Sequence, residues 1–518
     1  MDTLAYQRAQ RTEILLYRHV DGLILGAGGA AGRLGIGPTP LTRGPHRVTR
    51  GPYGRLSNCP ITRPPHPTVS SVRTLLRGTD MTATAAPETD HGLTHEYEHE
   101  PVPTEHRRSL RSVSAVWFGF PMILTNAIFG GTIVYGLGFW KGLAAIVVGN
   151  LVLLTYVGAL SYVAGRSGEN FGLTAERTFG RRGATVAAGF LSTVVIGWFA
   201  FQTGLTGATL HTALGWNETL TIFVAGLLYI GVTFVGIRAL TVIGIIAAPL
   251  FVLLALIALW FAARGGGLGG VTSYTGGGQG AAVLSIGAAV TIVIAGFADS
   301  GTMTADFTRW SRTGREAVIA AFSAFPIANF VSLLVGGIVV AAGAAASPSE
   351  NGGDFLPILT SHGALLTSIA VVFVFVNLGS VCTHCLYNGA VGWSQLTGSR
   401  MRVLTLVLGT LGLVAALAGV WSHFAAWLNL LGIFVPPIGA VLILDQLRPR
   451  AARAVTAWRA APFAAWAIGS LAAFAVHLWA PQLSEAVVGL LVGGLAYAVI
   501  DRVTRRADTS EPAAAVPA

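Results

Sequence analysis

The sequence predicts an all-α membrane protein of twelve transmembrane helices, in which the first ten form a five-plus-five inverted repeat and two additional C-terminal helices follow. Three observations predict it: the composition, the spacing of the apolar runs, and the interruption of two of those runs. Hydrophobic residues make up 53% of the 518 residues and charged residues only 11%. This balance excludes an ordinary soluble domain.

The net charge of +10 comes almost entirely from arginine, because Lys141 is the only lysine. The arginines stand between apolar runs, which marks membrane topology rather than a nucleic-acid surface. The chain has three cysteines, too few for a disulfide framework: Cys59, Cys382 and Cys385.

The amino-terminal residues 1–105 are rich in Arg, Gly, Pro, Thr and His and show no sustained apolar period. This composition predicts a disordered region without a cleaved signal peptide. Met81 opens a more acidic tail and is an alternative start of the chain. Residues 106–506 form the predicted twelve-span domain, and the Ala/Pro-rich residues 507–518 a disordered tail.

The apolar runs begin at Val113, and each approaches or exceeds the roughly 20 residues that a membrane-crossing helix needs. They are 113–137, 141–164, 184–211, 219–237, 240–263, 281–304, 316–345, 364–396, 401–420, 423–445, 460–479 and 483–500. Arginines gather in alternate loops, and positive charge is retained on the cytoplasmic side. Both termini are therefore predicted to be cytoplasmic, in a multi-pass protein of the cell's inner (plasma) membrane.

Two runs are interrupted near the middle of the membrane. Span one (113–137) carries Pro121 and Asn126, and span six (281–304) carries a Gly-rich break with a carboxylate at Asp299. A helix that stops in hydrocarbon leaves backbone groups without partners unless protein, water or solute supplies them. Since each run opens a block of five spans, the pair predicts an inverted-repeat transporter with its site at the midplane. The alternative for span six is a kink with a neutral, hydrogen-bonded Asp299.

Spans three and six offer aromatic side chains for such a site. Trp198 and Gln202 are four residues apart in span three (184–211) and share a helical face, where an aromatic plane beside an amide suits a flat heterocycle. Phe297, in the break of span six, is the candidate for the opposite aromatic face. The alternatives are packing of both rings between helices and a glutamine that bridges two helices.

Span eight (364–396) is unusually polar. Asn377 and Ser380 share a face and offer oxygen ligands for a hard cation, or else hydrogen bonds to a neighbouring helix. The run Cys382-Thr383-His384-Cys385 is a weak metal signal, because it lacks a second ligand pair, and buried small residues are the favoured interpretation. His384 is alternatively a proton-linked group, since its charge changes near neutral pH.

The run from Gly296 to Arg312, GFADSGTMTADFTRWSR, resembles the sixth span and following loop of the nucleobase:cation symporter family 1, particularly its bacterial cytosine permeases. Further similar segments are Gly149-Asn150, Gly197-Trp198-Phe199, Asn377 to Tyr387 and Val435 to Gly439. The resemblance covers about residues 101–506. It implies the LeuT-type, five-plus-five fold and the import of nucleobases or related heterocycles with Na⁺ or H⁺.

The resemblance also implies roles for single residues. It places the base between Trp198 and Phe297, with polar contacts from the Gly296 backbone, Asp299 and span eight near Asn377 and Cys382. Gln202 matches a substrate-binding glutamine of the related hydantoin and purine transporters, whereas Val195 stands where the cytosine permease has its glutamine.

For sodium, the implied ligands are the backbone carbonyls of Gly119, Met122 and Asn377 and the hydroxyl of Ser380. Val381 replaces the adjacent hydroxyl of the family and removes one ligand. A proton carried by Asp299 or His384 is therefore the alternative coupling ion.

We expect a secondary active transporter, not an enzyme, that imports a cytosine- or purine-like heterocycle by alternating access. It needs no cofactor, nucleic acid or obligatory protein partner beyond its small-molecule substrate, the coupling ion and the lipid bilayer. The alternatives are a nucleobase-binding membrane sensor of the same fold and a carrier of hydantoin- or allantoin-like compounds. Asp306 and Arg309, three apart after span six, are candidates for an inner gate or an ordinary exposed pair.

Overall fold

The computed structural model describes residues 95–265, 267–277, 284–448 and 456–510. In these ranges the chain is helical, with connecting loops and one isolated bridge between Arg108 and Ser311. The prediction of disorder for residues 1–94 and 511–518 lies outside the described residues, whereas residues 507–510 of the predicted tail are the last turn of the helix Glu485–Ser510. Residues 95–105 differ from the expectation: they pack against the helices, and Glu96 is 2% exposed. Composition misses this segment because its contacts are polar ones to distant helices.

The helices of the first half are α2 (Leu110–Gly119), α3 (Leu124–Leu137), α4 (Phe139–Ser167), α5 (Phe171–Phe179), α6 (Arg181–Leu214), α7 (Glu218–Val235) and α8 (Ile237–Arg264). Those of the second half are α9 (Ile286–Ala295), α10 (Ala298–Thr302), α11 (Ala305–Thr308), α12 (Gly314–Phe322), α13 (Asn329–Ala341), α14 (Pro348–Asn351), α15 (Leu356–Thr360), α16 (Ala364–Thr397), α17 (Met401–Leu417), α18 (Phe424–Leu447), α19 (Ala460–Trp479) and α20 (Glu485–Ser510). Short 3₁₀ segments are Thr104–His106, Gly267–Ser273 and Val420–His423, and a wide helical turn at Ser323–Ala328 links α12 to α13.

Nine helices among the described residues are long and apolar enough to cross a bilayer, counting α12 to α13 as one. The bent pair α2 and α3, which meet at 55°, makes a tenth if it is one span. The shorter apolar helices α9 and α17 lie where spans six and nine are predicted. The start of predicted span six, 281–283, falls outside the described residues.

Glycines end three of the longest helices. Gly168, Gly215 and Gly398 follow α4, α6 and α16 with φ of +77°, +68° and +70°. Residues other than Gly and Asn rarely adopt this left-handed backbone conformation. It lets the chain turn back, so that backbone N–H groups pair with the last carbonyls of the helix. The sequence thus ends each of these helices at a glycine.

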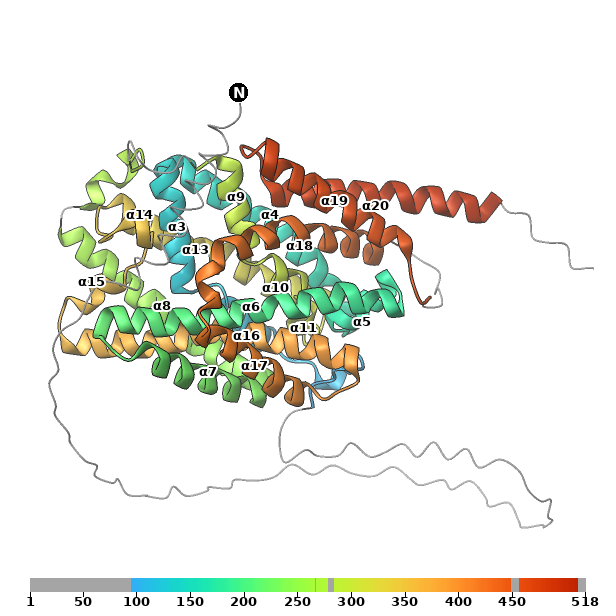
Figure 1. The fold of residues 1–518 in the computed structure, drawn as a ribbon, viewed down its shortest axis with the longest axis horizontal. Helices are drawn as coiled ribbons and strands as arrows, with labels where there is room; N and C mark the ends of the chain where they lie inside the picture. The colour runs from blue at the N-terminus through green and yellow to red at the C-terminus, as the bar shows by residue number, and fades with distance from the viewer. Residues whose placement is uncertain (1–94, 266, 278–283, 449–455, 511–518) are drawn as a thin grey trace, which may run out of the picture. The chain divides into compact units, whose positions relative to one another are not determined.

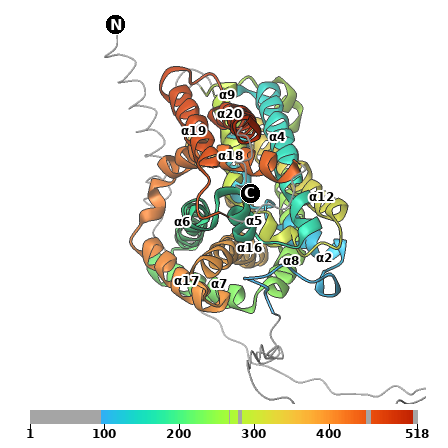
Figure 2. The same cartoon turned by 90° about the vertical axis from the view of Figure 1, so that its right-hand side faces the viewer.

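Helices α6 and α16 run side by side, as Figures 1 and 2 both show, and form the centre of the fold. In the end-on view of Figure 2, α7 and α17 lie at one edge, and α19 and α20 at the other. Helix α18 packs on α20 and on the short α10. The interrupted predicted span six therefore lies inside the protein, covered on that side by α18.

Backbones meet directly where α3 packs on α13. A Cβ atom on Gly336 would lie 1.7 Å from the carbonyl oxygen of Ala127, and one on Gly130 would lie 1.8 Å from that of Leu333. Small residues allow membrane helices to approach this closely, and dispersion contacts then replace side-chain packing.

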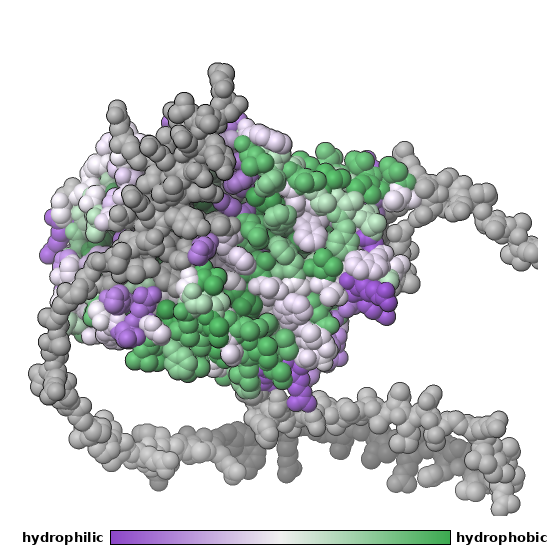
Figure 3. Space-filling view, viewed as in Figure 1, coloured by the Kyte–Doolittle hydropathy of each residue, from purple (hydrophilic) through white to green (hydrophobic). Residues whose placement is uncertain are grey.

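Apolar side chains cover the flanks of the helices. Figure 3 shows this surface between more hydrophilic regions that gather mainly toward the two ends of the helices. Leu220 on α7, Leu411 on α17 and Leu471 on α19 are 60%, 60% and 68% exposed. Exposed leucines in long rows are expected where lipid, rather than water, surrounds the protein.

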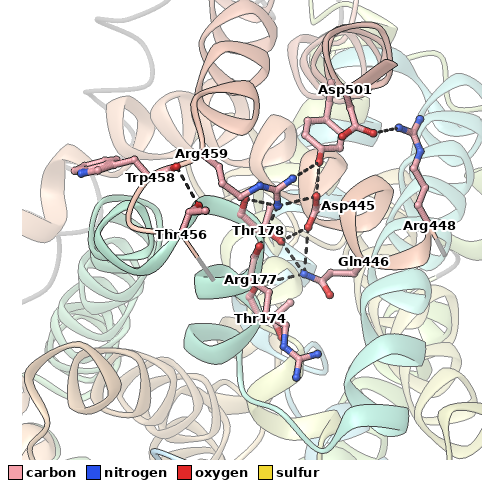
Figure 4. A network of polar contacts seen from close by, with 11 residues as sticks. Thr174, Arg177, Thr178, Asp445, Gln446, Arg448, Thr456, Trp458, Arg459 and Asp501 are labelled. Atoms are coloured by element: carbon pink, nitrogen blue, oxygen red, sulfur yellow. Dashed lines mark hydrogen bonds and ion pairs between the residues drawn. The ribbon is translucent and has the colours of Figure 1, made fainter. Parts of the chain in front are cut away.

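A polar network ties the carboxyl-terminal helices to the rest of the fold (Figure 4). Arg459, just before α19, donates to the Asp445 carboxylate of α18 at 3.0 Å and to the carbonyl of Thr178 at 2.8 Å. Tyr497 of α20 donates to the same carboxylate. Asp445 is 2% exposed, and burying a carboxylate is tolerated when it is paired and hydrogen-bonded. The network therefore holds α5, α18 and α20 together at the arginine-rich end.

Candidate functional site

The break in predicted span one is held open by amide and hydroxyl groups. Residues 120–123 separate α2 from α3, and Pro121 has no backbone N–H with which to continue the helix. Its carbonyl oxygen accepts from Nδ2 of Asn126 at 2.6 Å and from Oγ of Ser332 at 2.9 Å. The carbonyl that a continuous helix would satisfy is thus paired by side chains of α3 and α13.

The amide network continues into α4. Asn126 also donates to Oδ1 of Asn329 at 2.9 Å, and Asn329 donates to Oδ1 of Asn150 at 3.0 Å. These three side chains are 2%, 1% and 0% exposed. Hydrogen-bonded amides of this kind link helices within a membrane, so α3, α4 and α13 form one connected unit.

Asn377 of α16 closes the other side of the break. Its Oδ1 accepts from the backbone N–H of Leu124 at 2.8 Å, and its Nδ2 donates to the carbonyl of Met122 at 2.6 Å. The first amide of α3 would otherwise be an unpaired donor at a buried helix start. One side chain therefore satisfies both a donor and an acceptor of the interrupted backbone.

The second break separates α9 from α10 at Gly296 and Phe297. Asp299, in the first turn of α10, is fully buried, and its Oδ1 accepts from the N–H of Ser300 at 2.7 Å. Its carboxyl group lies beside the indole of Trp198 from α6. The predicted acid of this break thus faces the predicted aromatic residue.

The two breaks meet at a small enclosed pocket. Its cavity volume of about 10 Å³ gives room for about one water molecule, so a heterocycle does not fit in this conformation. The lining residues are Phe120, Ile123, Asn126, Trp198, Gly296, Phe297, Ser300, Val381 and Cys385.

Of the predicted substrate residues, Trp198, Gly296 and Phe297 line this pocket. Asn126, Val381 and Cys385 were expected in other roles, whereas Phe120, Ile123 and Ser300 were not predicted. Phe120 packs edge-on against Phe297, with ring centroids 5.3 Å apart. Its position directly before Pro121, at the break of span one, is the sequence feature that could have identified it as a pocket residue. Ser300 and Cys385 approach each other at 3.9 Å between Oγ and Sγ.

The remaining predicted substrate residues lie around the pocket rather than on its wall. Gln202 accepts at Oε1 from the hydroxyl of Thr125 at 2.9 Å, and its Nε2 has no hydrogen-bond partner among the described residues. Cys382 faces α6, with Sγ 3.8 Å from the carbonyl oxygen of Phe199. Cys385, one turn away from Val381, takes the pocket position that the prediction gave to Cys382.

Of the predicted sodium ligands, Met122 and Asn377 are in direct contact. The carbonyl of Met122 already accepts from Asn377, which leaves it one lone pair. The hydroxyl of Ser380 is buried and has no partner among the described residues. Gly119 packs so closely on α8 that a Cβ would lie 2.5 Å from Cα of Gly244. Val381, which has no side-chain oxygen, lines the pocket.

His384 joins α16 to α2. Its Nε2 lies 3.0 Å from the carbonyl oxygen of Val116, its Nδ1 lies 2.5 Å from that of Ser380, and its ring stacks on Phe120 at 4.8 Å. Carbonyls only accept, so a neutral imidazole can donate to one of them, whereas the protonated ring can donate to both. His384 is thus placed where a proton would alter a contact between the broken span and α16.

The Cys382–Cys385 run does not gather around one point. Cys382 faces Phe199 of α6, His384 faces α2, and Cys385 faces Ser300 of α10. Among the described residues there is no group of three or more His, Cys, Asp or Glu side chains that could hold a metal ion.

Comparisons with known proteins agree with this arrangement. The profile of a family described as permeases for cytosine/purines, uracil, thiamine and allantoin matches residues 101–461. The cytosine permease of Escherichia coli strain K12 is 30% identical over 414 residues, which are 79% of this chain and 95% of the relative. The hydantoin permease of Microbacterium maritypicum is 24% identical over 406 residues, 72% of this chain and 81% of the relative.

Among solved structures, the fold is similar to that of Mhp1, a nucleobase-cation-symport-1 family transporter, in a closed conformation with bromovinylhydantoin bound. The TM-score is 0.65 at 19% identity, and the match covers 79% of this chain and 96% of that chain. At this identity the likeness shows the fold.

Proposed function

This chain belongs to the permease family for cytosine/purines, uracil, thiamine and allantoin, and we propose that it imports a nucleobase or closely related flat heterocycle in symport with a cation. It is a membrane transporter and not an enzyme. Its matched relative in Escherichia coli is a cytosine permease, and the resemblance extends over 95% of that protein. A cytosine- or purine-like base is therefore the first candidate substrate.

The observation that carries this proposal is the pocket where the two interrupted spans meet. Trp198 and Phe297 contribute aromatic rings to it, and Gly296 and Ser300 contribute backbone and hydroxyl groups from the break. Aromatic faces stack on planar heterocycles, and exposed helix ends supply both donors and acceptors for their edges. The base binds between these rings once the pocket opens beyond its closed volume.

A hydantoin- or allantoin-like compound is the second candidate, and Gln202 is the observation that favours it. Its Nε2 is a buried donor without a partner among the described residues, and an unpaired buried amide is costly. The matched hydantoin permease shares 24% identity with this chain. A ring carbonyl of the substrate would accept from this Nε2.

The coupling ion is Na⁺ or H⁺. A sodium ion would take the carbonyls of Gly119, Met122 and Asn377 and the hydroxyl of Ser380, and it would lock the broken span to α16. In the proton alternative, His384 or Asp299 carries the charge. The unpartnered Ser380 hydroxyl supports sodium, and the replacement of a further hydroxyl by Val381 supports the proton.

We further propose that twelve spans cross the inner membrane, with the first ten in the five-plus-five arrangement and both termini in the cytoplasm. The paired breaks α2/α3 and α9/α10 support the repeat. The arginine-rich ends of α4, α6 and α18 support the orientation. The substrate then leaves toward the end of the molecule that carries the polar network of Figure 4.

Uptake into proteoliposomes tests the proposal. Radiolabelled cytosine, uracil, hypoxanthine and allantoin are offered with a sodium gradient and a pH gradient imposed separately. The wild type is expected to accumulate at least one of them, and Trp198→Ala to lose uptake while its membrane amount stays unchanged. Trp479→Ala, at a lipid-facing position that is 79% exposed, is the matched control. Binding of a base without accumulation would instead identify a sensor.

A further inference from the structure

Residues 95–103, the amino-terminal strap, cross the arginine-rich end of the helices. Its residue Glu96 is 2% exposed, and Val102 is 1% exposed. Val102 donates its backbone N–H to the carbonyl of Gly168 at 2.9 Å. The strap is therefore a packed part of the fold and not a solvated tail.

Glu96 joins the start of α8 to α16. Its Oε1 accepts from the N–H of Ile237, the first residue of α8, at 3.1 Å, and its Oε2 accepts from the hydroxyl of Tyr387 on α16 at 2.9 Å. A carboxylate at a helix N-terminus pairs a free amide and meets the positive end of the helix dipole. Gly236 makes room for it, because a Cβ there would lie 2.0 Å from Oε1.

Arg309 holds the same strap from the other side. It follows α11, on the chain that continues from the broken span six, and it is fully buried. Its Nη1 donates to the carbonyl of Tyr97 at 2.6 Å and its Nη2 to the carbonyl of Glu96 at 2.8 Å. The strap is thus bound at once by the element that carries the pocket's break and by α8 and α16.

Further contacts widen this attachment. Oε1 of Glu98 accepts from the N–H of Met401, the first residue of α17, at 2.9 Å, and its carbonyl accepts from Asn170 beside α5. Tyr97, between Glu96 and Glu98 in the strap, has a φ of +48°. This value is uncommon for a residue other than Gly and is maintained only where surrounding contacts enforce it. Here the bond from Arg309 to its carbonyl and the packing of its ring on Trp310, 6.0 Å away, supply those contacts.

Buried polar groups without partners lie between the pocket and the strap. Asn388 follows Tyr387 on α16 and is three residues beyond Cys385 of the pocket wall, and neither of its amide atoms has a partner among the described residues. Oδ2 of Asp306 is likewise without one, although Oδ1 accepts from the N–H of Phe171 at 2.9 Å. Such groups are costly in a dry interior and are satisfied when water or substrate reaches them. Asn388 is adjacent to Tyr387, the hydroxyl of which donates to Glu96 of the strap.

We propose that residues 95–103 are the cytoplasmic gate of this transporter, with Glu96 and Arg309 as the positioning residues that hold it shut. In the closed state the strap ties α11 to α8 and α16. It detaches from at least one side before the pocket can open past Asn388 to the cytoplasm. The direction of opening rests on the proposed function, whereas the attachment itself does not.

Thiol labelling can report whether the pocket is accessible, because Cys385 lines it and Cys382 is buried nearby. In a Cys59→Ser background, a membrane-impermeant maleimide added to inside-out vesicles reaches these thiols only through the cytoplasmic side. Glu96→Ala removes the acceptors for Ile237 and Tyr387 and is expected to speed labelling about tenfold, the effect of losing one to two net hydrogen bonds. Glu100→Ala, at an exposed position of the same strap, is the matched control and keeps the wild-type rate.

Right-side-out vesicles separate gating from general loosening. A released gate leaves labelling from the outer side unchanged or slower, whereas a destabilised protein is labelled faster from both sides. If Glu96→Ala does not accumulate, Tyr387→Phe removes only the hydroxyl that donates to Glu96 and is judged by the same two rates. Labelling equal to that of Glu100→Ala, or faster from both sides, overturns the proposal. No substrate is needed, so a failed gate and a failed substrate assignment are distinguishable.

Discussion

The role of Asn377 can be tested against a second asparagine of the same helix. Asn377 and Asn388 are both on α16 and both fully buried. Asn377 pairs the N–H of Leu124 and the carbonyl of Met122, while Asn388 has no partner among the described residues. Replacing either by Ala removes the same atoms and leaves a cavity of the same size, so the two variants differ in the hydrogen bonds lost.

The expected difference follows from the burial of the two backbone groups. Leu124 and Met122 are 1% and 2% exposed, and a buried group left without its partner costs about 1–3 kcal/mol. Asn377→Ala is therefore expected to lose about 2–6 kcal/mol for the two groups. Asn388→Ala is expected to lose only its packing and to recover the cost of an unpaired amide, so that its stability stays near that of the wild type.

Thermal unfolding of the purified variants in one detergent, followed by intrinsic fluorescence, gives the ranking. Asn377→Ala should melt clearly below Asn388→Ala, and its uptake should fall because the start of α3 is no longer fixed beside the pocket. Equal melting temperatures, or a lower one for Asn388→Ala, would refute the reasoning that the amide bridge holds the break.

Three further outcomes are expected. Ser380→Ala should abolish sodium-driven uptake and spare proton-driven uptake, measured with the two gradients imposed separately, because it removes the one unpartnered hydroxyl of the sodium set. Gly336→Ala should lower the yield of folded protein on size exclusion, since its Cβ would meet a carbonyl at 1.7 Å, whereas Gly231→Ala, with nothing within 4 Å, should not. Burial raises the pKa of Glu96, against the opposing effects of the Tyr387 hydroxyl and the Arg309 and Arg108 charges. A proton is then held more tightly in the closed gate than in the open one, so low pH favours closure and this advantage is lost as the pH rises through the raised pKa. Cytoplasmic thiol labelling, normalised at each pH to Glu96→Gln, should therefore increase with pH; a flat ratio contradicts it.

The breaks could be predicted from the sequence because their causes are local. Pro121 lacks a donor and Gly296 has no side chain, so each interrupts a helix wherever the chain places it. The pairing of the two breaks was predicted from topology, because each break lies in the first span of a block of five. For Trp198, the spacing from Gln202 made it a candidate and left packing between helices open, and the resemblance placed it at the substrate; in the structure Trp198 lines the pocket.

The orientation of α16 and the strap could not be predicted in the same way. Small and polar residues surround Cys382 and Cys385 on all sides of α16, so no apolar stripe indicates which of them faces the pocket. Glu96 lies in a polar segment that composition assigns to solvent. Its partners, Ile237, Arg309 and Tyr387, are far away in the sequence, and only the fold brings them to it.

The contact between α3 and α13 limits how the pocket can open. Because the glycines of each helix pack directly against carbonyl groups of the other, the two helices cannot slide along each other. We therefore expect α3 and α13 to move together as one rigid unit. We expect the bending to occur at residues 120–123, between α2 and α3, where the Phe120 ring packs on both Phe297 and His384. We therefore expect a displacement of α3 and α13 to shift the Phe120 ring against both Phe297 and the His384 imidazole.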